Sequence, residues 1–260
     1  MLGHTIGDYV EVIESSPNCD VAKASFDTYN DRDWSGYQAL QHPRVQWYEV
    51  EGRFFSGVDG VTEEVDNWRD AYPEASADVT NLVDCGDDRV LIEWTLNGQR
   101  RGLATGPEGQ EIPENIRVHS ADTMQLRDGN VYAGRTYYSL ESAQTVHAVQ
   151  GGLGASSPTL PDTPQYRLRL DDTVNARDAR AALAGRLSAA YPGGEVEIAN
   201  LVDYGSDRVI IEWSYIGGFG RTYGCDLMQL REGTVYGVRT YYGLVSAGLV
   251  IAAQGADREG

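Results

Sequence analysis

Lysine is almost missing from this sequence, and basic residues as a whole are outnumbered by acidic ones. Lys23 is the only lysine, and 21 Lys and Arg stand against 39 Asp and Glu, for a net charge of -18. Binding to nucleic acid or to an anionic membrane relies on clustered cations that neutralise phosphate groups. The composition therefore argues against either partner and is typical of an acidic, well-hydrated surface.

Cysteine and histidine are also scarce. The three cysteines (Cys19, Cys85 and Cys225) cannot all pair within one chain, and none lies in a CxxC unit. The four histidines show no HxxxH or HxH spacing, so we expect no metal site and no cofactor. Unpaired cysteines are typical of a reducing compartment, and we expect a cytoplasmic protein.

Long apolar runs are absent as well. No run approaches the roughly 20 residues that a membrane helix requires. The first residues include Asp8, Glu11 and Glu14 and lack the basic and then apolar pattern of a signal peptide. We therefore expect no membrane partner.

What the sequence does contain is an internal repeat. The first half carries AYP at 71–73, NLVD at 81–84, DRV at 88–90 and IEW at 92–94, and the second half carries the same motifs, equally spaced, at 190–192, 200–203, 207–209 and 211–213. MQLR at 124–127 and RTYY at 135–138 recur at 228–231 and 239–242. Units of this length indicate a duplicated domain and not a solenoid. We expect a complete domain over residues 1–150, a Gly/Ser/Pro-rich linker over 151–164 and a truncated copy over 165–260.

The first copy is predicted to have helices followed by an antiparallel meander. Asn18 or Asp20 can cap a helix to residue 31, and further elements are expected as a strand at 45–50, a helix at 61–71 and strands at 79–84, 89–97, 117–127 and 131–138. This order predicts an α+β fold with a curved sheet wrapped around helices. The second copy starts almost directly at a strand over 166–170. It would borrow its closing helices from the first copy or serve as a built-in dimer partner.

Several stretches of the first copy resemble SnoaL-like sequences of the NTF2-like superfamily. They are HPRV at 42–45 leading into Trp47, GVDG at 57–60, Trp68 before Tyr72, DRV into EW at 93–94, and RDGNV at 127–131. The resemblance implies two fused cone-shaped domains, an apolar pocket for a hydrophobic small molecule, cofactor-free acid/base chemistry and frequent dimerisation. One departure is that Ser139 and Gly243 stand where such sequences end their last strand with Asp.

Asp122 is the first catalytic candidate. Strand alternation places it on the face of Met124 and Leu126, where an apolar cone would desolvate the carboxyl group and raise its pKa. A neutral carboxylic acid can donate a hydrogen bond to a developing enolate, as one does in ketosteroid isomerase. A buried Asp that only ties a loop is an equal alternative. Asp226 repeats the arrangement, and Glu49 lies where isomerases and epoxide hydrolases of the superfamily carry an acid.

Aromatic and basic side chains complete the expected site. Pure core packing is the competing interpretation for the tryptophans, and a surface ion pair for the arginines. The candidate substrate-binding residues are Tyr29, Trp47, Trp68, Trp94, Met124, Arg135, Tyr137, Trp213 and Arg239.

Three functions stay open at the level of the sequence. The first is a cofactor-independent cyclase or isomerase that acts on a polyketide-like natural-product intermediate. The second is an epoxide hydrolase or epoxide-opening cyclase, for which Asp122 and Glu49 form the acid pair. The third is a noncatalytic ligand-binding module. In each case the fusion would act as a dimer within one chain, and further homodimerisation is left open.

Overall fold

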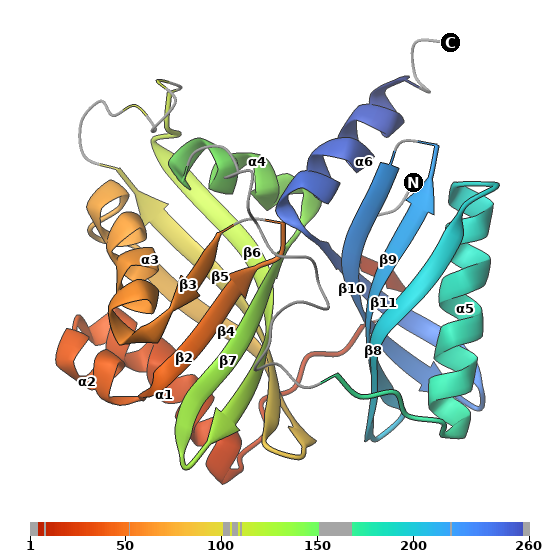
Figure 1. The fold of residues 1–260 in the computed structure, drawn as a ribbon, viewed down its shortest axis with the longest axis horizontal. Coiled ribbons are helices and arrows are strands. Elements are labelled where there is room, and N and C mark those ends of the chain that lie inside the picture. The colour runs from red at the N-terminus through yellow and green to blue at the C-terminus, as the bar shows by residue number, and fades with distance from the viewer. Residues whose placement is uncertain are drawn as a thin grey trace.

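The computed structural model describes residues 5–7, 9–51, 53–100, 105, 109, 111–150, 168–218 and 220–256. It is an α+β protein of two units that lie side by side, each a curved, largely antiparallel sheet with helices on its outer face (Figure 1). The strand order β4-β5-β6-β7-β11-β10-β9-β8 runs through both units. The two halves of this order mirror each other about the junction of β7 with β11, where Tyr138 pairs with Tyr242.

The first unit contains the elements expected from the sequence and three short additions. Its elements are α1 (Pro17–Asp31), α2 (Trp34–Ala39), β2 (Gln41–Glu49), β3 (Phe54–Ser56), α3 (Gly57–Ala71), β4 (Ser76–Gly86), β5 (Arg89–Gln99), β6 (Asn115–Arg127), β7 (Asn130–Tyr138) and α4 (Leu140–Gln150). The predicted helices and strands are confirmed, while α2, β3 and α4 were not predicted. Helix α1 is capped by Ser16, whose side chain accepts from Cys19 N, and neither Asn18 nor Asp20 is the cap.

The second unit repeats the meander but not the helices in front of it. Its elements are α5 (Val174–Ala190), β8 (Glu195–Gly205), β9 (Arg208–Gly217), β10 (Gly220–Arg231), β11 (Thr234–Tyr242) and α6 (Leu244–Ala256). The pairing of β8 to β11 matches that of β4 to β7, including the irregularities at Val79/Asn81 and Ile198/Asn200. The expected linker and residues 166–167 of the expected strand lie outside the described residues, as does most of residues 101–110.

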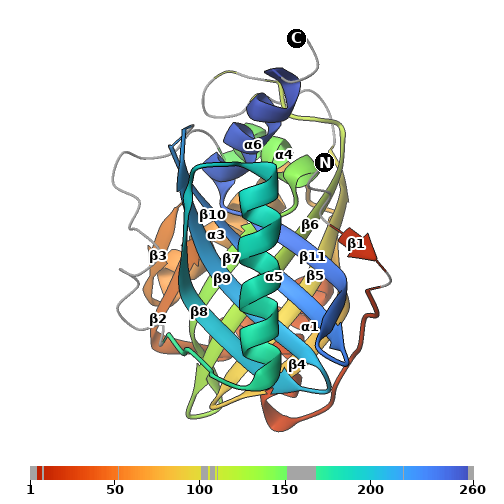
Figure 2. The ribbon, with the colours of Figure 1, turned by 90° about the vertical axis from the view of Figure 1, so that its right-hand side faces the viewer.

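The expectation that the second unit lacks a helix of its own is wrong, because α5 packs across its sheet (Figure 2). Thr173 caps α5 and donates to Asp203, as Ser16 caps α1 and donates to Asp84. The AYP motif that ends α3 in the first unit also ends α5. One helix therefore stands where the first unit has everything from α1 to α3.

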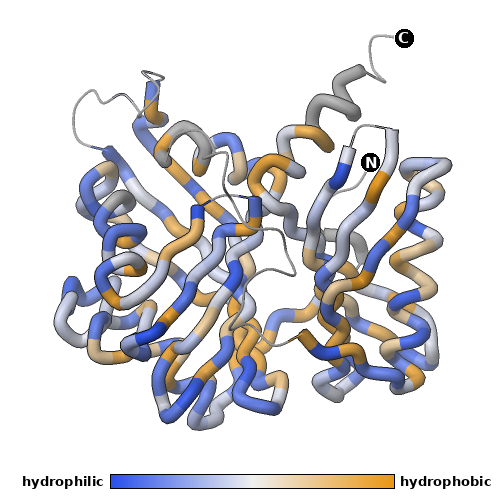
Figure 3. Tube along the Cα trace, in the orientation of Figure 1, coloured by the Kyte–Doolittle hydropathy of each residue, from blue (hydrophilic) through white to orange (hydrophobic). Residues whose placement is uncertain are grey.

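The sheets pack back to back, and the N-terminal segment ties them together. Apolar side chains of both units, such as Leu91, Ala121, Ile210 and Leu227, form a buried cluster between the sheets. In the hydropathy view, apolar segments run along the strands and polar ones mark the hairpin ends (Figure 3). β1 (Thr5–Gly7) pairs with β11 of the second unit before the chain enters α1 of the first.

Candidate functional site

A cavity lies inside the cone of the first unit, between its sheet and the helices α1 to α3. It contains about 760 Å³ of empty space when the solvent at its mouth is included. Most of its wall is apolar. The aromatic residues that line it are Phe26, Tyr29, Tyr37, Trp47, Trp68, Trp94 and Tyr138. Among the described lining residues the charged types are two acids, Glu64 and Asp122, and no Lys, Arg or His.

Asp122 lies on β6 in the wall of this cavity with its side chain 2% exposed. Trp94 Nε1 donates to its Oδ2 over 2.8 Å, whereas Oδ1 is buried and has no hydrogen-bond partner among the described residues. Burial raises the pKa of Asp122 to about 7, and the charge of Glu49 adds to the rise. Hydrogen bonds from Thr136 and Trp94 limit it. A carboxyl group with this pKa exchanges a proton readily at neutral pH.

Glu64 is the second acid of the cavity, and the sequence analysis missed it. It lies on α3, where Trp68 Nε1 donates to its Oε1 over 3.1 Å. Burial, together with the charges of Glu49 and Asp122, raises the pKa of Glu64 to about 8, and Arg53 opposes the rise. Helical spacing could have found this residue, because positions 61, 64, 65 and 68 share one face of α3.

Two tyrosines complete the polar lining near the acids. The pKa of Tyr37 is raised by burial and then by Glu64 and Asp122, so its phenol stays protonated. Burial and the charge of Glu49 likewise raise the pKa of Tyr138. Both hydroxyls can therefore donate hydrogen bonds.

Glu49 lies behind the cavity wall and is 1% exposed. Tyr138 donates to its Oε1 over 2.9 Å, and Arg53 Nε lies 3.7 Å from its Oε2. It is absent from the residues that line the cavity. Its expected role as a direct acid does not fit this position, and it acts on Asp122 through its charge.

Of the remaining candidates, Tyr29, Trp47, Trp68, Trp94 and Met124 line the cavity. Trp47 is held there because Gly134 lies under its ring, where a Cβ atom would come within 2.3 Å of it. Trp47 Nε1 donates to Thr136, the residue that pairs with Asp122 across the sheet.

Arg135, Tyr137 and Arg239 face the other unit and do not line the cavity. Arg135 and Tyr137 bind Glu212 at 3.4 and 2.8 Å, and Glu212 and Arg135 are both fully buried. The alternative to substrate binding expected for the arginines was an ion pair at the surface. Arg135 instead forms its ion pair in the interface between the sheets.

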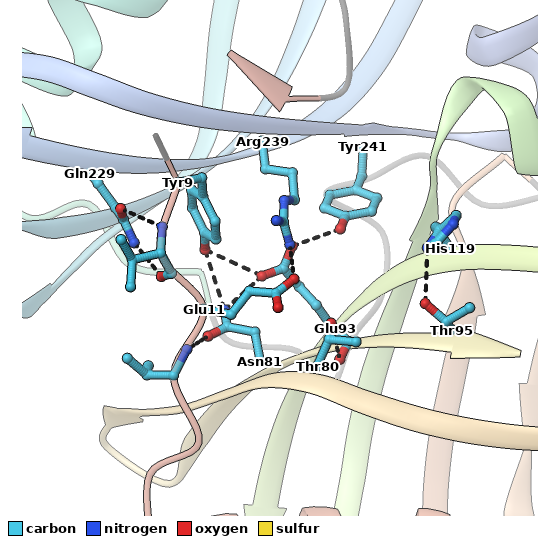
Figure 4. A network of polar contacts seen from close by, with 12 residues as sticks. Tyr9, Glu11, Thr80, Asn81, Glu93, Thr95, His119, Gln229, Arg239 and Tyr241 are labelled. Carbon is cyan, nitrogen blue, oxygen red and sulfur yellow. Dashed lines mark hydrogen bonds and ion pairs between the residues drawn. The ribbon is translucent and has the colours of Figure 1, made fainter. Parts of the chain in front are cut away.

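The same arrangement recurs with the units exchanged. Glu93 of the first unit accepts from Tyr241 over 2.6 Å and from Arg239 over 3.1 Å, and Tyr9 and Asn81 bind its other oxygen (Figure 4). The contact between the two sheets is therefore a pseudo-two-fold interface. Each unit supplies one glutamate and one Arg-Tyr pair to it.

In the second unit, the acid equivalent to Asp122 is bound by a side chain of helix α5. Arg186 of α5 binds Asp226 Oδ2 and donates to Thr240 Oγ1 over 3.0 Å. Trp213 is 1% exposed and packs edge-on against Tyr242, and its Nε1 has no hydrogen-bond partner among the described residues. These positions do not suit Asp226 and Trp213 to the catalytic and binding roles that the repeat suggests.

Ser139 and Gly243, which replace the expected Asp, stand at the start of helices. Ser139 Oγ accepts from Ser142 N in α4, and at Gly243 the carboxylate of Glu51 approaches and accepts from Ser246 N in α6. Both positions therefore belong to the starts of helices, and neither lines the cavity. Among the described residues, no group of three or more His, Cys, Asp or Glu is placed to hold a metal ion.

Residues 22–133 match the SnoaL-like domain family. No curated protein matches the chain. None of the described helices has the length and apolar character to span a membrane.

Several solved structures are similar to parts of the chain. A candidate SnoaL-like polyketide cyclase from Jannaschia sp. CCS1 is 17% identical over 56% of this chain and 99% of its own, with a TM-score of 0.44. A candidate polyketide cyclase from Xanthomonas campestris is 18% identical over 52% and 97%, with a TM-score of 0.42. AclR from Streptomyces galilaeus, described as a candidate hydroxylase, is 17% identical over 48% and 90%, with a TM-score of 0.40. The SnoaL-like match supports a module of the cyclase or isomerase type or one that binds ligands.

Proposed function

We propose that the first unit is a cofactor-independent enzyme that transfers a proton to or from an unsaturated, largely apolar small molecule, in a cyclisation or isomerisation. The observation that carries the proposal is the Asp122 carboxyl group in the cavity wall, with a pKa of about 7 and one oxygen free of hydrogen bonds. A general acid or base works best when its pKa is near the working pH. A polyketide-like intermediate is the substrate class that we infer from the resemblance of the sequence.

Glu64 gives the site a second proton carrier. Because two nearby carboxyl groups resist carrying two negative charges, the pair holds a proton near neutral pH. One acid can then donate to an oxygen of the substrate while the other accepts a proton from carbon. The aromatic walls favour a flat substrate and would hold it in a reactive pose.

Opening of an epoxide is the second candidate, because it also needs two acids facing one ligand. Asp122 and Glu64 meet that requirement better than the expected pair of Asp122 and Glu49, since both of them line the cavity. A noncatalytic ligand-binding module would hold its ligand against the same aromatic side chains without transferring a proton.

We also infer that residues 165–260 are a shortened second SnoaL-like copy that serves as an internal dimer partner. The matching strand registers and helix caps of the two units support this inference. The cysteines in the described structure are buried and unpaired, which supports a reducing, cytoplasmic setting.

The test is metabolite profiling of a strain that lacks the gene, complemented with the wild type, Asp122→Asn, Glu64→Gln or Asp226→Asn. We expect the first two variants to accumulate the unprocessed intermediate, with turnover lowered by about 10²- to 10⁴-fold. Asp226→Asn is the matched control in the second unit, and its product level is compared after correction for protein abundance. Normal product with both Asp122→Asn and Glu64→Gln would leave only the carrier function.

A further inference from the structure

The two cones hold equivalent acids in different surroundings. Asp122 pairs with Thr136 across the sheet, and Asp226 pairs with Thr240 in the same way. The helix in front of each acid starts from an equivalent cap, Ser16 in one unit and Thr173 in the other. Counted from these caps, Tyr29 of α1 corresponds to Arg186 of α5.

In the second cone this position supplies a cation to the acid. The Arg186 guanidinium bridges Asp226 Oδ2 and Thr240 Oγ1, and Asp226 is fully buried. Guanidinium groups suit such sites because their N–H donors are fixed in one plane. The side chains around Asp226 therefore accommodate a flat guanidinium group.

In the first cone the equivalent position holds a neutral residue, Tyr29. Tyr29 lines the cavity and brings no positive group, and the described hydrogen bond to Asp122 comes from the neutral indole of Trp94, whereas a guanidinium binds Asp226. Among the described residues that line the cavity of the first cone, none supplies the cation that Arg186 supplies in the second. A ligand that carries its own cation would restore the pairing seen in the second unit.

We propose that the cavity of the first unit binds a small planar organic cation, an amidinium or a protonated amine, on Asp122 in the way that Arg186 is bound on Asp226. The inference rests on the proposed function and specifies the charge of its substrate. Of the two acids, Asp122 then pairs with the charge and Glu64 keeps the exchangeable proton. Aromatic faces such as those of Trp68 and Trp94 add favourable cation–π contact.

The charges that face Asp122 agree with this assignment. Glu49 from β2 raises the pKa of Asp122 through its charge, Glu64 from α3 is the second acid of the cavity, Tyr37 and Tyr138 are protonated phenols, and Arg53 lies beside Glu49. Once Asp122 has lost its proton, a cation that enters the cavity therefore meets a carboxylate with no basic side chain among the described lining residues.

The test is titration calorimetry of the full chain with benzamidine and with benzamide, which share a planar shape and differ in charge. At pH 8 we expect benzamidine to bind about tenfold or more tightly than benzamide. Because Asp122 must lose its proton to pair with the cation, the affinity for benzamidine should rise by about tenfold per pH unit between pH 5 and pH 7. Equal affinities, or an affinity that falls as the pH rises, would overturn the inference.

Two variants test the position of the cation, and each is measured only as a folded protein. Asp122→Asn should lose the preference for benzamidine, and Tyr29→Arg should place an internal cation on Asp122 and lower the affinity by about tenfold or more. Unchanged benzamidine binding in a folded Tyr29→Arg protein would refute the proposed position. If benzamidine fails to bind while Asp122→Asn still blocks turnover in the strain, this inference fails and the proposed enzyme stands. If benzamidine binds while Asp122→Asn restores the normal product in the strain, the cation site stands and the proposed enzyme fails.

Discussion

Replacing Asp122 by asparagine should make the protein more stable in mildly alkaline buffer, although the replaced residue is the proposed catalytic group. In the folded protein the pKa of Asp122 is raised from 3.8 to about 7 by burial. The folded state therefore binds the proton more tightly than the unfolded state between pH 4 and pH 7. Stability from this group is present at low pH and is lost as the pH rises through that interval.

The magnitude follows from the two pKa values. Each pKa unit is worth about 1.4 kcal/mol, so ionising Asp122 in the folded protein lowers the free energy of unfolding by about 4 kcal/mol above pH 7. Asparagine keeps the shape and an oxygen for Trp94 Nε1 but cannot ionise. We therefore expect the difference in stability between variant and wild type to grow by about 3 kcal/mol from pH 5 to pH 8.

The assay is urea denaturation at pH 5, 6, 7 and 8, followed by circular dichroism, on the wild type, Asp122→Asn and Asp226→Asn. Asp226 is the matched control, because its carboxylate is paired with Arg186. Its replacement leaves that guanidinium buried without a charge partner and should destabilise the protein by about 3–5 kcal/mol at pH 8. The reasoning is refuted if Asp122→Asn gives no gain with rising pH, or if both variants respond alike.

Two further predictions concern the interface and the cavity wall. Glu212→Gln should lower the free energy of unfolding by about 3–5 kcal/mol, and more than Glu93→Gln does, because it removes the negative charge bound by the fully buried Arg135, whereas Arg239 beside Glu93 is partly exposed; urea denaturation of both variants compares them. A smaller loss for Glu212→Gln than for Glu93→Gln would contradict this. Trp94→Phe removes a hydrogen bond that holds down the pKa of Asp122, so the infrared band of the protonated carboxyl should persist to a higher pH than in the wild type. An unchanged or lower midpoint would count against that hydrogen bond.

The strands and one face of the site were predictable from local patterns. The repeated motifs and the period of two predicted the meander of the first unit, and alternation put Asp122 and Met124 on the face that lines the cavity. The positions of Arg135 and Tyr137 were not predictable in this way. They depend on the register between β6 and β7, which no local pattern specifies.

A single β-bulge decides that register. Arg127 pairs with Asn130 next to the hairpin, and an unbroken ladder from there would set Arg135 opposite Asp122. The ladder shifts by one residue between Gln125 and Leu126, so Thr136 takes that place and Arg135 turns to the other face of the sheet. The shift converts an expected substrate contact into half of the interface between the units.

A buried carboxyl group must be neutralised by a proton or by a cation, and the two cones use one solution each. Asp226 is paired with the guanidinium of Arg186 from α5. Asp122 has no cation and is held protonated by burial, at the wall of an open cavity. We therefore propose one reactive site per chain, in the first unit, with the second unit as its partner across the back-to-back interface.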